Sequence, residues 1–342
     1  MAKKLRVGLV GCGKIARVSH IPRFVAMRDT EVAALFDVPL FSPEAGLILS
    51  AARTKSASAA GGLAEVHGQI GVNIAPCSRN CSFCAFASKN KVFEESVELT
   101  VEEVVERTRQ FVEAGANAVF LMSTAHYPFG RFVELSIDVR RAVGPEPVLV
   151  ANVGDFDDGG AQRLKDAGFD GVYHAVRMGE GRDTAIPVEK RLKTFHAAAA
   201  AGLTLGTCVE PVGPEHDTAE LVDKTLITRD AAPAYSGAMR RIPIPATALG
   251  ELGIVSEARM AHLVAVTRLA LGRAIPGHCT HEPSTLGALA GANLLWAETG
   301  ANPRDTAEET EGQRGVSVDD CRRMLAEAEW KALDGPSRFY RG

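Results

Sequence analysis

From about residue 70 onward, short apolar runs alternate with longer segments in which apolar residues recur every three or four positions. The short runs are typical of buried strands, and the longer segments are typical of amphipathic helices. The expected strands are residues 70–75, 118–123, 147–153, 170–175, 203–209, 236–243, 274–278 and 293–297. This alternation predicts an α/β fold of the (βα)8 TIM type, with a doubly wound open sheet as the alternative.

The expected helices carry recognisable ends. In the segment 100–115, Thr100 can cap the first turn and Glu103 stands three residues later, which is a capping-box pattern. Gly115 then ends the segment, because glycine readily takes the left-handed conformation found after helices. The same passage from helix through glycine to strand recurs after residues 159–168 and 189–202.

Residues 1–37 follow a different pattern. An apolar run leads into Gly11-x-Gly13-x-x-Ala16, and a second expected strand ends at Asp37. Glycines at this spacing let a pyrophosphate approach a helix N-terminus, and an acidic residue after the second strand can bind a ribose. The segment resembles the opening βαβ unit of Gfo/Idh/MocA oxidoreductases, which implies an NAD(P)-dependent oxidoreductase as an alternative function. A complete nucleotide-binding fold does not follow, so a structural or vestigial appendage is favoured.

The changes of pattern divide the chain into four parts. The sequence predicts a Rossmann-like fragment, a lead-in helix with a flexible linker, the barrel and a C-terminal helical tail. Their expected bounds are residues 1–37, 38–69, 70–300 and 301–342.

The composition is that of a globular protein, with 46% hydrophobic and 23% charged residues among 342. The formal net charge of −4 gives no indication of a nucleic-acid-binding surface, and no apolar run reaches the roughly 20 residues that span a bilayer. The N-terminal apolar run lacks a signal-peptide cleavage site, so a cytoplasmic location is expected. Seven cysteines fit reduced thiols better than a disulfide framework.

Three of these cysteines, Cys77, Cys81 and Cys84, form a C-x3-C-x2-C pattern directly after the first expected strand. Soft thiolate ligands select iron–sulfur clusters or zinc. Zinc would need a fourth nearby Cys or His, and none follows at zinc-finger spacing. The pattern therefore favours a [4Fe–4S] cluster with one iron open to another ligand.

This spacing, with the aromatic Phe83 before the third cysteine, resembles the radical S-adenosylmethionine (SAM) superfamily. The resemblance implies that SAM binds the open iron and is cleaved reductively to a 5′-deoxyadenosyl radical, which takes a hydrogen atom from a small-molecule substrate in cofactor or metabolite biosynthesis. It also implies a reductant such as flavodoxin or ferredoxin. A non-enzymatic iron–sulfur or zinc protein is a further hypothesis.

Residues 70–335 resemble biotin synthase and its relatives, through segments such as AGANAVFLMSTAHY and AQRLKDAGFDGVYHAVRM. Those relatives include methylornithine synthase, the maturation protein of [FeFe]-hydrogenase and the radical SAM protein of [Fe]-hydrogenase cofactor assembly. The segment EPVGPEH, residues 210–216, resembles the last of these. In biotin synthase, cysteines on three strands hold a second, sulfur-donating cluster. The matching residues here are Leu121, about Val150, and Gly206, so that cluster is expected to be missing.

The same resemblance implies which residues contact SAM. Phe83 would place its backbone near adenine, and Ser123 and Thr124 would meet the methionine amino end. His174 and Arg177 would lie near the ribose and the carboxylate. Arg177 departs from the acidic residue of biotin synthase, so Glu180 or Glu210 would serve the ribose hydroxyls instead.

A second group of candidates stands at the ends of later strands. Cys208, His278, Cys279, His281 and Glu282 are expected to converge at the barrel mouth, and Cys208, Cys279 and His278 are the candidate catalytic residues. A second metal, a hydrogen-atom-donating thiol and polar substrate contacts all remain open, as does a structural role for Cys208. Asn152 and Asp155 are candidate substrate-facing groups, and Cys12 and Cys321 receive no role.

Overall fold

The computed structural model describes residues 33–245, 247–272, 274–300, 302–305 and 315–341. Eight parallel strand positions close into a barrel, because β10 pairs with both β9 and β11, and β11 pairs with β1. The barrel strands are β1 (Leu63–Gly71), β4 (Ala118–Met122), β5 (Leu149–Asn152), β6 (Gly171–Tyr173), β7 (Thr204–Gly206), β9 (Tyr235–Arg240), β10 (Gly277–Cys279) and β11 (Leu294–Gly300). The (βα)8 prediction is therefore confirmed.

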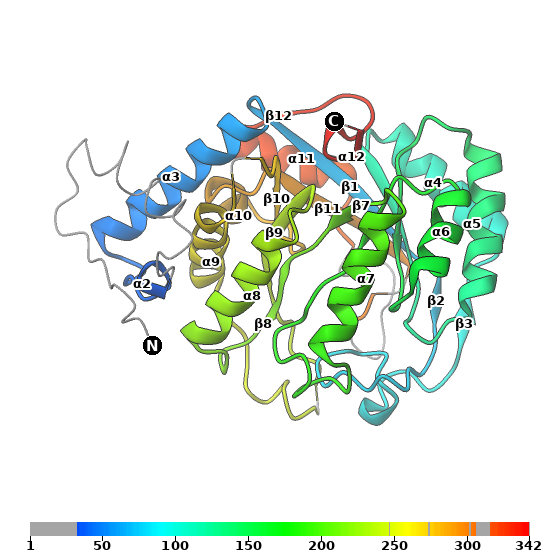
Figure 1. Ribbon diagram of the computed structural model, residues 1–342. Helices are drawn as coiled ribbons and strands as arrows, with labels where there is room; N and C mark the ends of the chain where they lie inside the picture. Colours follow the sequence, from blue (N-terminus) through cyan, green and yellow to red (C-terminus); the bar gives the residue numbers. More distant parts are fainter. Residues whose placement is uncertain (1–32, 246, 273, 301, 306–314, 342) are drawn as a thin grey trace.

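Helices surround these strands (Figure 1). They are α4 (Val101–Glu113), α5 (Phe129–Val143), α6 (Asp158–Asp166), α7 (Val188–Ala200), α8 (Thr218–Asp230), α9 (Glu257–Ala270), α10 (Thr285–Leu289) and α11 (Val318–Glu327). Helix α4 carries the expected capping box, in which Thr100 and Glu103 each accept a hydrogen bond from the backbone of the other. Outside this ring, α3 (Pro43–Ala59) packs on α9 through Ile48 and Ala52. Within the described residues, no helix is both long and apolar enough to cross a membrane.

Side chains alternate between the two faces of the barrel wall. On β4, Ala118 and Phe120 point into the interior, whereas Val119 and Leu121 pack against the helices. Aromatic rings dominate the interior, and the Phe120 and Trp296 ring centroids lie 4.3 Å apart. These rings leave little free space inside the barrel near the amino ends of its strands.

The amino ends of the strands are covered by α12 (Arg338–Arg341). Its Phe339 and Tyr340 are buried in the interior aromatic cluster, and the Arg338 N–H donates to Glu65 at the start of β1. The opposite end, where the carboxyl ends of the strands meet, is where (βα)8 enzymes place their active sites.

Three elements differ from the sequence expectation. Strand β1 begins at Leu63, inside the segment 38–69 that was expected to be a helix and linker. The fifth strand is divided into β7 and β8 (Val209–Val212), of which β8 pairs with β9. The expected second strand of the N-terminal βαβ unit is instead the short helix α2 (Ala33–Phe36).

Asp37, the expected ribose ligand, accepts a hydrogen bond of 2.7 Å from Thr218 at the start of α8. Gly11, Gly13 and Ala16 lie outside the described residues. The described part of the N-terminal segment therefore gives no support to a nicotinamide-binding role. Cys12 also lies outside the described residues.

Candidate functional site

The cysteine loop, residues 75–90, follows β1 and lies between β2 (Asn73–Ile74) and β3 (Val97–Glu98), which pair with each other in antiparallel fashion. Backbone hydrogen bonds fix its shape: the Cys77 N–H donates to the Phe86 carbonyl at 2.6 Å, and the Cys84 N–H donates to the Cys81 carbonyl at 3.1 Å. The Asn90 side chain donates to the Cys84 carbonyl at 2.9 Å. These bonds come from the backbone and from Asn90, so they do not depend on the thiols.

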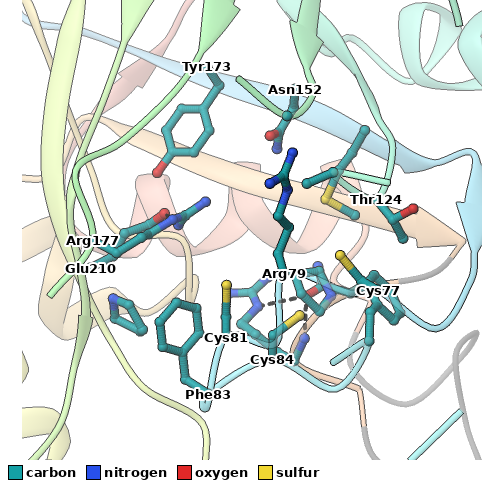
Figure 2. A pocket seen from close by; sticks show the side chains of 18 of the residues that line it. Cys77, Arg79, Cys81, Phe83, Cys84, Thr124, Asn152, Tyr173, Arg177 and Glu210 are labelled. Carbon is teal, nitrogen blue, oxygen red and sulfur yellow. Dashed lines mark hydrogen bonds and ion pairs between the residues drawn. The ribbon is translucent and has the colours of Figure 1, made fainter. Parts of the chain in front are cut away.

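All three thiols of the loop are free and face one chamber at the carboxyl ends of the strands. Figure 2 shows the sulfur atoms of Cys77, Cys81 and Cys84 on one side of this chamber, with Tyr173 and Asn152 on the other. Burial raises the pKa of the Cys84 thiol to about 12, and the charge of Cys81 adds to this effect. A bound cation must therefore displace a proton from Cys84 at neutral pH. Three soft sulfur donors on one loop fit an iron–sulfur cluster.

Six of the seven residues expected to contact SAM line the same chamber. These are Phe83, Ser123, Thr124, His174, Arg177 and Glu210. Asn152, expected to face the substrate, also lines it and donates to Gln69 at 3.2 Å. The seventh residue, Glu180, lies behind the lining.

Thr124 is held in place by Asn73 of β2. The Thr124 N–H donates to the Asn73 side-chain oxygen at 2.9 Å, and the Asn73 amide donates to the Thr124 hydroxyl oxygen at 3.1 Å. Both residues are buried. Since the Thr124 oxygen accepts this bond, its own proton remains available to donate to a ligand.

Arg177, Glu210 and His281 form a continuous polar row along one wall. Arg177 is ion-paired with one carboxylate oxygen of Glu210, and Nδ1 of His281 lies 2.9 Å from the other. Burial lowers the pKa of His281 to about 4. The imidazole is therefore neutral at pH 7, and its Nδ1–H donates to Glu210.

A second polar group supports the chamber from behind. Arg191 contacts Asp155 at 3.1 Å and Glu180 at 3.0 Å, and His174 lies 3.0 Å from Asp155. Burial opposes ionisation of Asp155, yet the hydrogen bond with His174 and the charge of Arg191 together lower its pKa below the usual value. Glu180 and Asp155 therefore position Arg191 and His174, which line the chamber, rather than lining it themselves.

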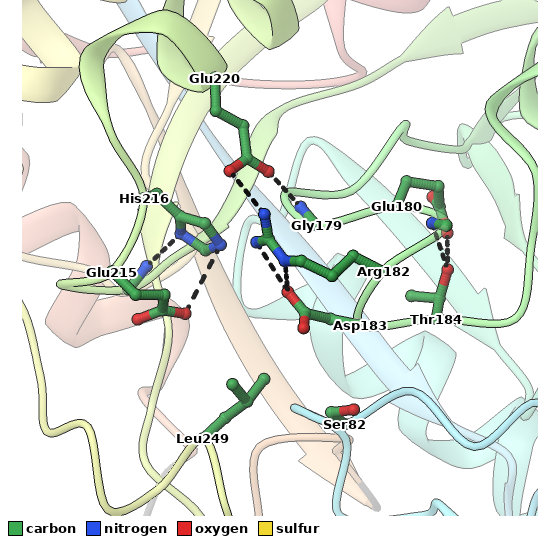
Figure 3. Close-up of polar contacts among 12 residues, drawn as sticks. Ser82, Gly179, Glu180, Arg182, Asp183, Thr184, Glu215, His216, Glu220 and Leu249 are labelled. Atoms are coloured by element: carbon green, nitrogen blue, oxygen red, sulfur yellow. Dashed lines mark hydrogen bonds and ion pairs between the residues drawn. The ribbon is translucent and has the colours of Figure 1, made fainter.

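The loop 179–184 after β6 ties the cysteine loop to α8 (Figure 3). The Glu220 carboxylate of α8 accepts from the Gly179 N–H at 2.6 Å and from Arg182 at 3.2 Å. Arg182 in turn pairs with Asp183, whose backbone carbonyl accepts from the Ser82 N–H at 2.8 Å. Glu220 thus acts on the cysteine loop through a chain of three contacts.

We expect Glu220→Gln to loosen this chain without unfolding the barrel. The neutral amide removes the charge from two hydrogen bonds, and charge-assisted bonds are about twice as strong as neutral ones. Amide hydrogen exchange at Gly179 and Ser82 is expected to accelerate. The exposed Glu189→Gln on α7 is the matched control, and equal exchange in both variants would contradict the proposed chain of contacts.

The structure moves some sequence candidates away from the chamber. His278 points outward and its Nε2 bonds the Val264 carbonyl of α9 at 2.8 Å, because successive residues of β10 face opposite sides. Glu282 pairs with Arg240 instead of joining the chamber. Three positions were compared with the sulfur-donor cysteines of biotin synthase. Val150 and Gly206 lie on the inner face of the barrel, whereas Leu121 faces the helices.

The other cysteines of the described residues lie in two places. Cys208 and Cys279 meet in the barrel interior, 3.0 Å apart, and His281 lies beside them. Cys321, for which no role was expected, is buried on α11 and donates to the Trp296 carbonyl at 3.3 Å. The expected convergence of five residues therefore holds for three of them.

Several chamber residues were not expected from the sequence. Arg79 of the cysteine loop, Gln69 of β1, Tyr173 of β6, Arg241 and Arg304 all line it. Gln69 belongs to the alternation Glu65, His67, Gln69 along β1, which was a usable signal for polar residues facing inward. Arg241 and Arg304 stand outside any motif, and only the closed barrel brings them to this wall.

The fold and this site together define a class of enzyme. Residues 75–226, which carry the cysteine loop and most of the chamber, match the Radical SAM superfamily. The chain is a radical SAM enzyme, and this family uses a [4Fe–4S] cluster and S-adenosylmethionine. Within this superfamily, the chain is similar to biotin synthases.

The sequence relatives support this placement. The chain is 28% identical to a biotin synthase of Paramagnetospirillum magneticum over 285 residues, which is 78% of this chain and 84% of that one. It is 26% identical to a biotin synthase of Halorhodospira halophila over 251 residues, 71% and 76% of the two chains.

Solved structures confirm the fold. A crystal structure of methylornithine synthase has a TM-score of 0.75 at 19% identity, and the match covers 94% of this chain and 98% of that one. A maturase of the [FeFe]-hydrogenase has a TM-score of 0.76 at 16% identity and covers 96% and 78%. The Gfo/Idh/MocA alternative finds no support in these comparisons.

Proposed function

We propose that the chain cleaves SAM reductively to start radical chemistry on a small polar substrate, in the biosynthesis of a cofactor or metabolite. The observation that carries this proposal is that three free thiols of one loop face the same chamber as Thr124, Arg177 and other polar groups. Cys77, Cys81 and Cys84 would hold the [4Fe–4S] cluster. When bound, the cluster supplies the electron that splits the sulfonium of SAM, so that the nucleoside fragment can take a hydrogen atom.

The residues of the chain would bind and orient SAM. Thr124, held by Asn73, and the neighbouring Ser123 would donate hydrogen bonds to its methionine part. Arg177 has donors beyond those used by Glu210 and would bind the carboxylate. His174 and the Phe83 backbone would contact the ribose and the adenine, while Glu210 would accept from ribose hydroxyls.

The chamber wall opposite the cysteine loop would hold the substrate. Asn152 and Tyr173 present an amide and a hydroxyl group there (Figure 2), and Gln69 lines the chamber as the hydrogen-bond partner of Asn152, which suits a small polar molecule. Positions 150 and 206 carry Val and Gly, so neither offers a thiol. A Cβ atom at position 206 would lie 2.4 Å from the Tyr235 ring. We therefore propose chemistry other than sulfur insertion through a donor cluster at those positions.

A cytoplasmic reductant such as flavodoxin or ferredoxin would supply the electron. The six cysteines within the described residues are all free thiols, which suits a reducing compartment. The surface that meets the reductant would include the exposed part of the cysteine loop, since electrons must reach a cluster bound there.

Anaerobic reconstitution with iron and sulfide tests the proposal. After reduction with dithionite, addition of SAM is expected to release 5′-deoxyadenosine and methionine, quantified by liquid chromatography and mass spectrometry. A sample without dithionite is the control and is expected to release neither. Full iron and sulfide content without nucleoside release would contradict the proposal and favour an iron–sulfur protein without SAM-cleaving activity.

A further inference from the structure

A set of three soft-metal ligands lies in the barrel interior, away from the cysteine loop. The sulfur atoms of Cys208 and Cys279 are 3.0 Å apart, and both residues are buried and free. One ligand atom from each cysteine and one imidazole nitrogen of His281 all lie within 4.8 Å of one another. Two thiolates with an imidazole are a typical donor set for zinc.

The backbone makes room for the two sulfur atoms. Cys208 follows β7 and Cys279 ends β10, and Gly237 of β9 pairs directly with Cys279. A Cβ at position 237 would lie 2.7 Å from the Cys279 sulfur and 2.0 Å from its carbonyl oxygen. Glycine at 237 thus leaves free the space that a side chain would take from the sulfur.

His281 is oriented as metal-binding histidines are. Its Nδ1 is engaged by Glu210 at 2.9 Å, and Glu210 is held by Arg177. Its Nε2 is buried and has no hydrogen-bond partner among the described residues. Histidine ligands of zinc usually donate their second ring N–H to a carboxylate or a carbonyl, which fixes the tautomer and frees the other nitrogen.

We propose that Cys208, Cys279 and His281 bind a soft divalent cation, for which Zn²⁺ is the probe, below the floor of the chamber. On binding, two thiols release their protons to solvent and no electron is transferred, so two thiolates neutralise the cation. The fourth coordination position faces the chamber, since His281 and Tyr173 line it while the two cysteines do not. Zinc binding here is independent of SAM cleavage.

Tyr173 stands next to this position. Its ring centroid is 5.1 Å from that of His281, and its hydroxyl is buried without a partner in the described part of the chain. A metal there would give this hydroxyl a partner, or would bind a heteroatom of the substrate beside it. The site would thus extend the polar floor on which the substrate rests.

The test measures zinc and iron in the same reconstituted holoenzyme. The protein is incubated anaerobically with Zn²⁺, weakly bound metal is removed with a chelator, and both elements are determined by plasma mass spectrometry. One zinc per chain is expected in the wild type. Cys208→Ala and Cys279→Ala are each expected to lose the zinc and keep the iron, whereas Cys321→Ala, at another buried free thiol, keeps both.

His281→Gln gives a second variant in case an alanine variant folds poorly, and it is likewise expected to lose the zinc. Circular dichroism of each variant checks the fold. Wild-type protein without zinc, or zinc retained in folded Cys208→Ala and Cys279→Ala, would overturn the proposal. So would an intact-mass decrease of two hydrogen atoms under anaerobic reducing conditions, because it would indicate a Cys208–Cys279 disulfide, which offers no thiolates.

Discussion

Replacing Cys77, Cys81 or Cys84 by alanine is expected to remove the iron–sulfur cluster and to reduce 5′-deoxyadenosine release to background. Each thiol would supply one of the three protein ligands of the proposed cluster, and alanine offers no donor atom. The loop itself should persist, because the bonds that shape it run from the backbone of Cys77 and Cys84 and from Asn90. Iron and sulfide analysis, visible absorption and the SAM assay give the readouts.

Cys321→Ala is the matched control for these variants. It removes an equally free thiol from α11, outside the chamber. Its iron content and nucleoside release are expected to equal those of the wild type. If any of the three loop variants kept both properties, the cluster would have to be bound elsewhere and the assignment of the loop would be wrong.

Arg191→Met is expected to destabilise the fold by about 3–5 kcal/mol, the usual effect of removing one partner from buried ion pairs. Arg191 is the shared partner of Asp155 and Glu180, whose side chains are 4% and 0% exposed. Methionine keeps most of the volume but leaves both carboxylates without their counter-charge. Urea unfolding of the two proteins at pH 7 measures the difference in unfolding free energy.

Arg131→Met provides the control, because Arg131 pairs with Glu98 while its own side chain is 63% exposed. Such surface pairs contribute about 0–1 kcal/mol, so its effect should be small. An equal loss in both variants would contradict the proposed role of Arg191.

The same variant also carries a pH signature. The pKa of Asp155 is lowered in the folded state, so its contribution to stability is present above the ordinary aspartate pKa of about 3.9 and is lost as pH falls below that value. Without Arg191, the pKa of Asp155 rises and less stability is lost on acidification. The difference between wild type and variant is therefore expected to shrink between pH 7 and about pH 3.

The barrel could be predicted because strands such as β4 and β5 are buried on both faces and read as apolar runs. Strand β1 escaped this pattern in its first half. Its residues Glu65, His67 and Gln69 point inward, and the Glu65–His67 pair is satisfied at 2.8 Å inside the barrel. A segment in which every second residue is polar looks like an exposed linker when the hydrogen-bond partners of those polar residues are unknown.

The residues of the site also differ in how far the sequence could predict them. The cysteine trio could be proposed as a site because its members lie close together in the sequence, and family resemblance led to Thr124 and Arg177, which line the same chamber. The orientation of His278 could not, since one residue of register on β10 decides between the interior and α9. The meeting of Cys208 with Cys279, 71 residues apart in the chain, was expected from the positions of their strand ends, but their place in the interior outside the chamber lining was not.

The aromatic residues Phe339 and Tyr340 have a kinetic consequence. Because they fill the barrel at the amino ends of its strands, molecules reach the chamber through the mouth beside the cysteine loop. Whatever binds deepest must then arrive first and depart last. Turnover should accordingly follow a compulsory order, in which the outer ligand blocks exchange of the inner one.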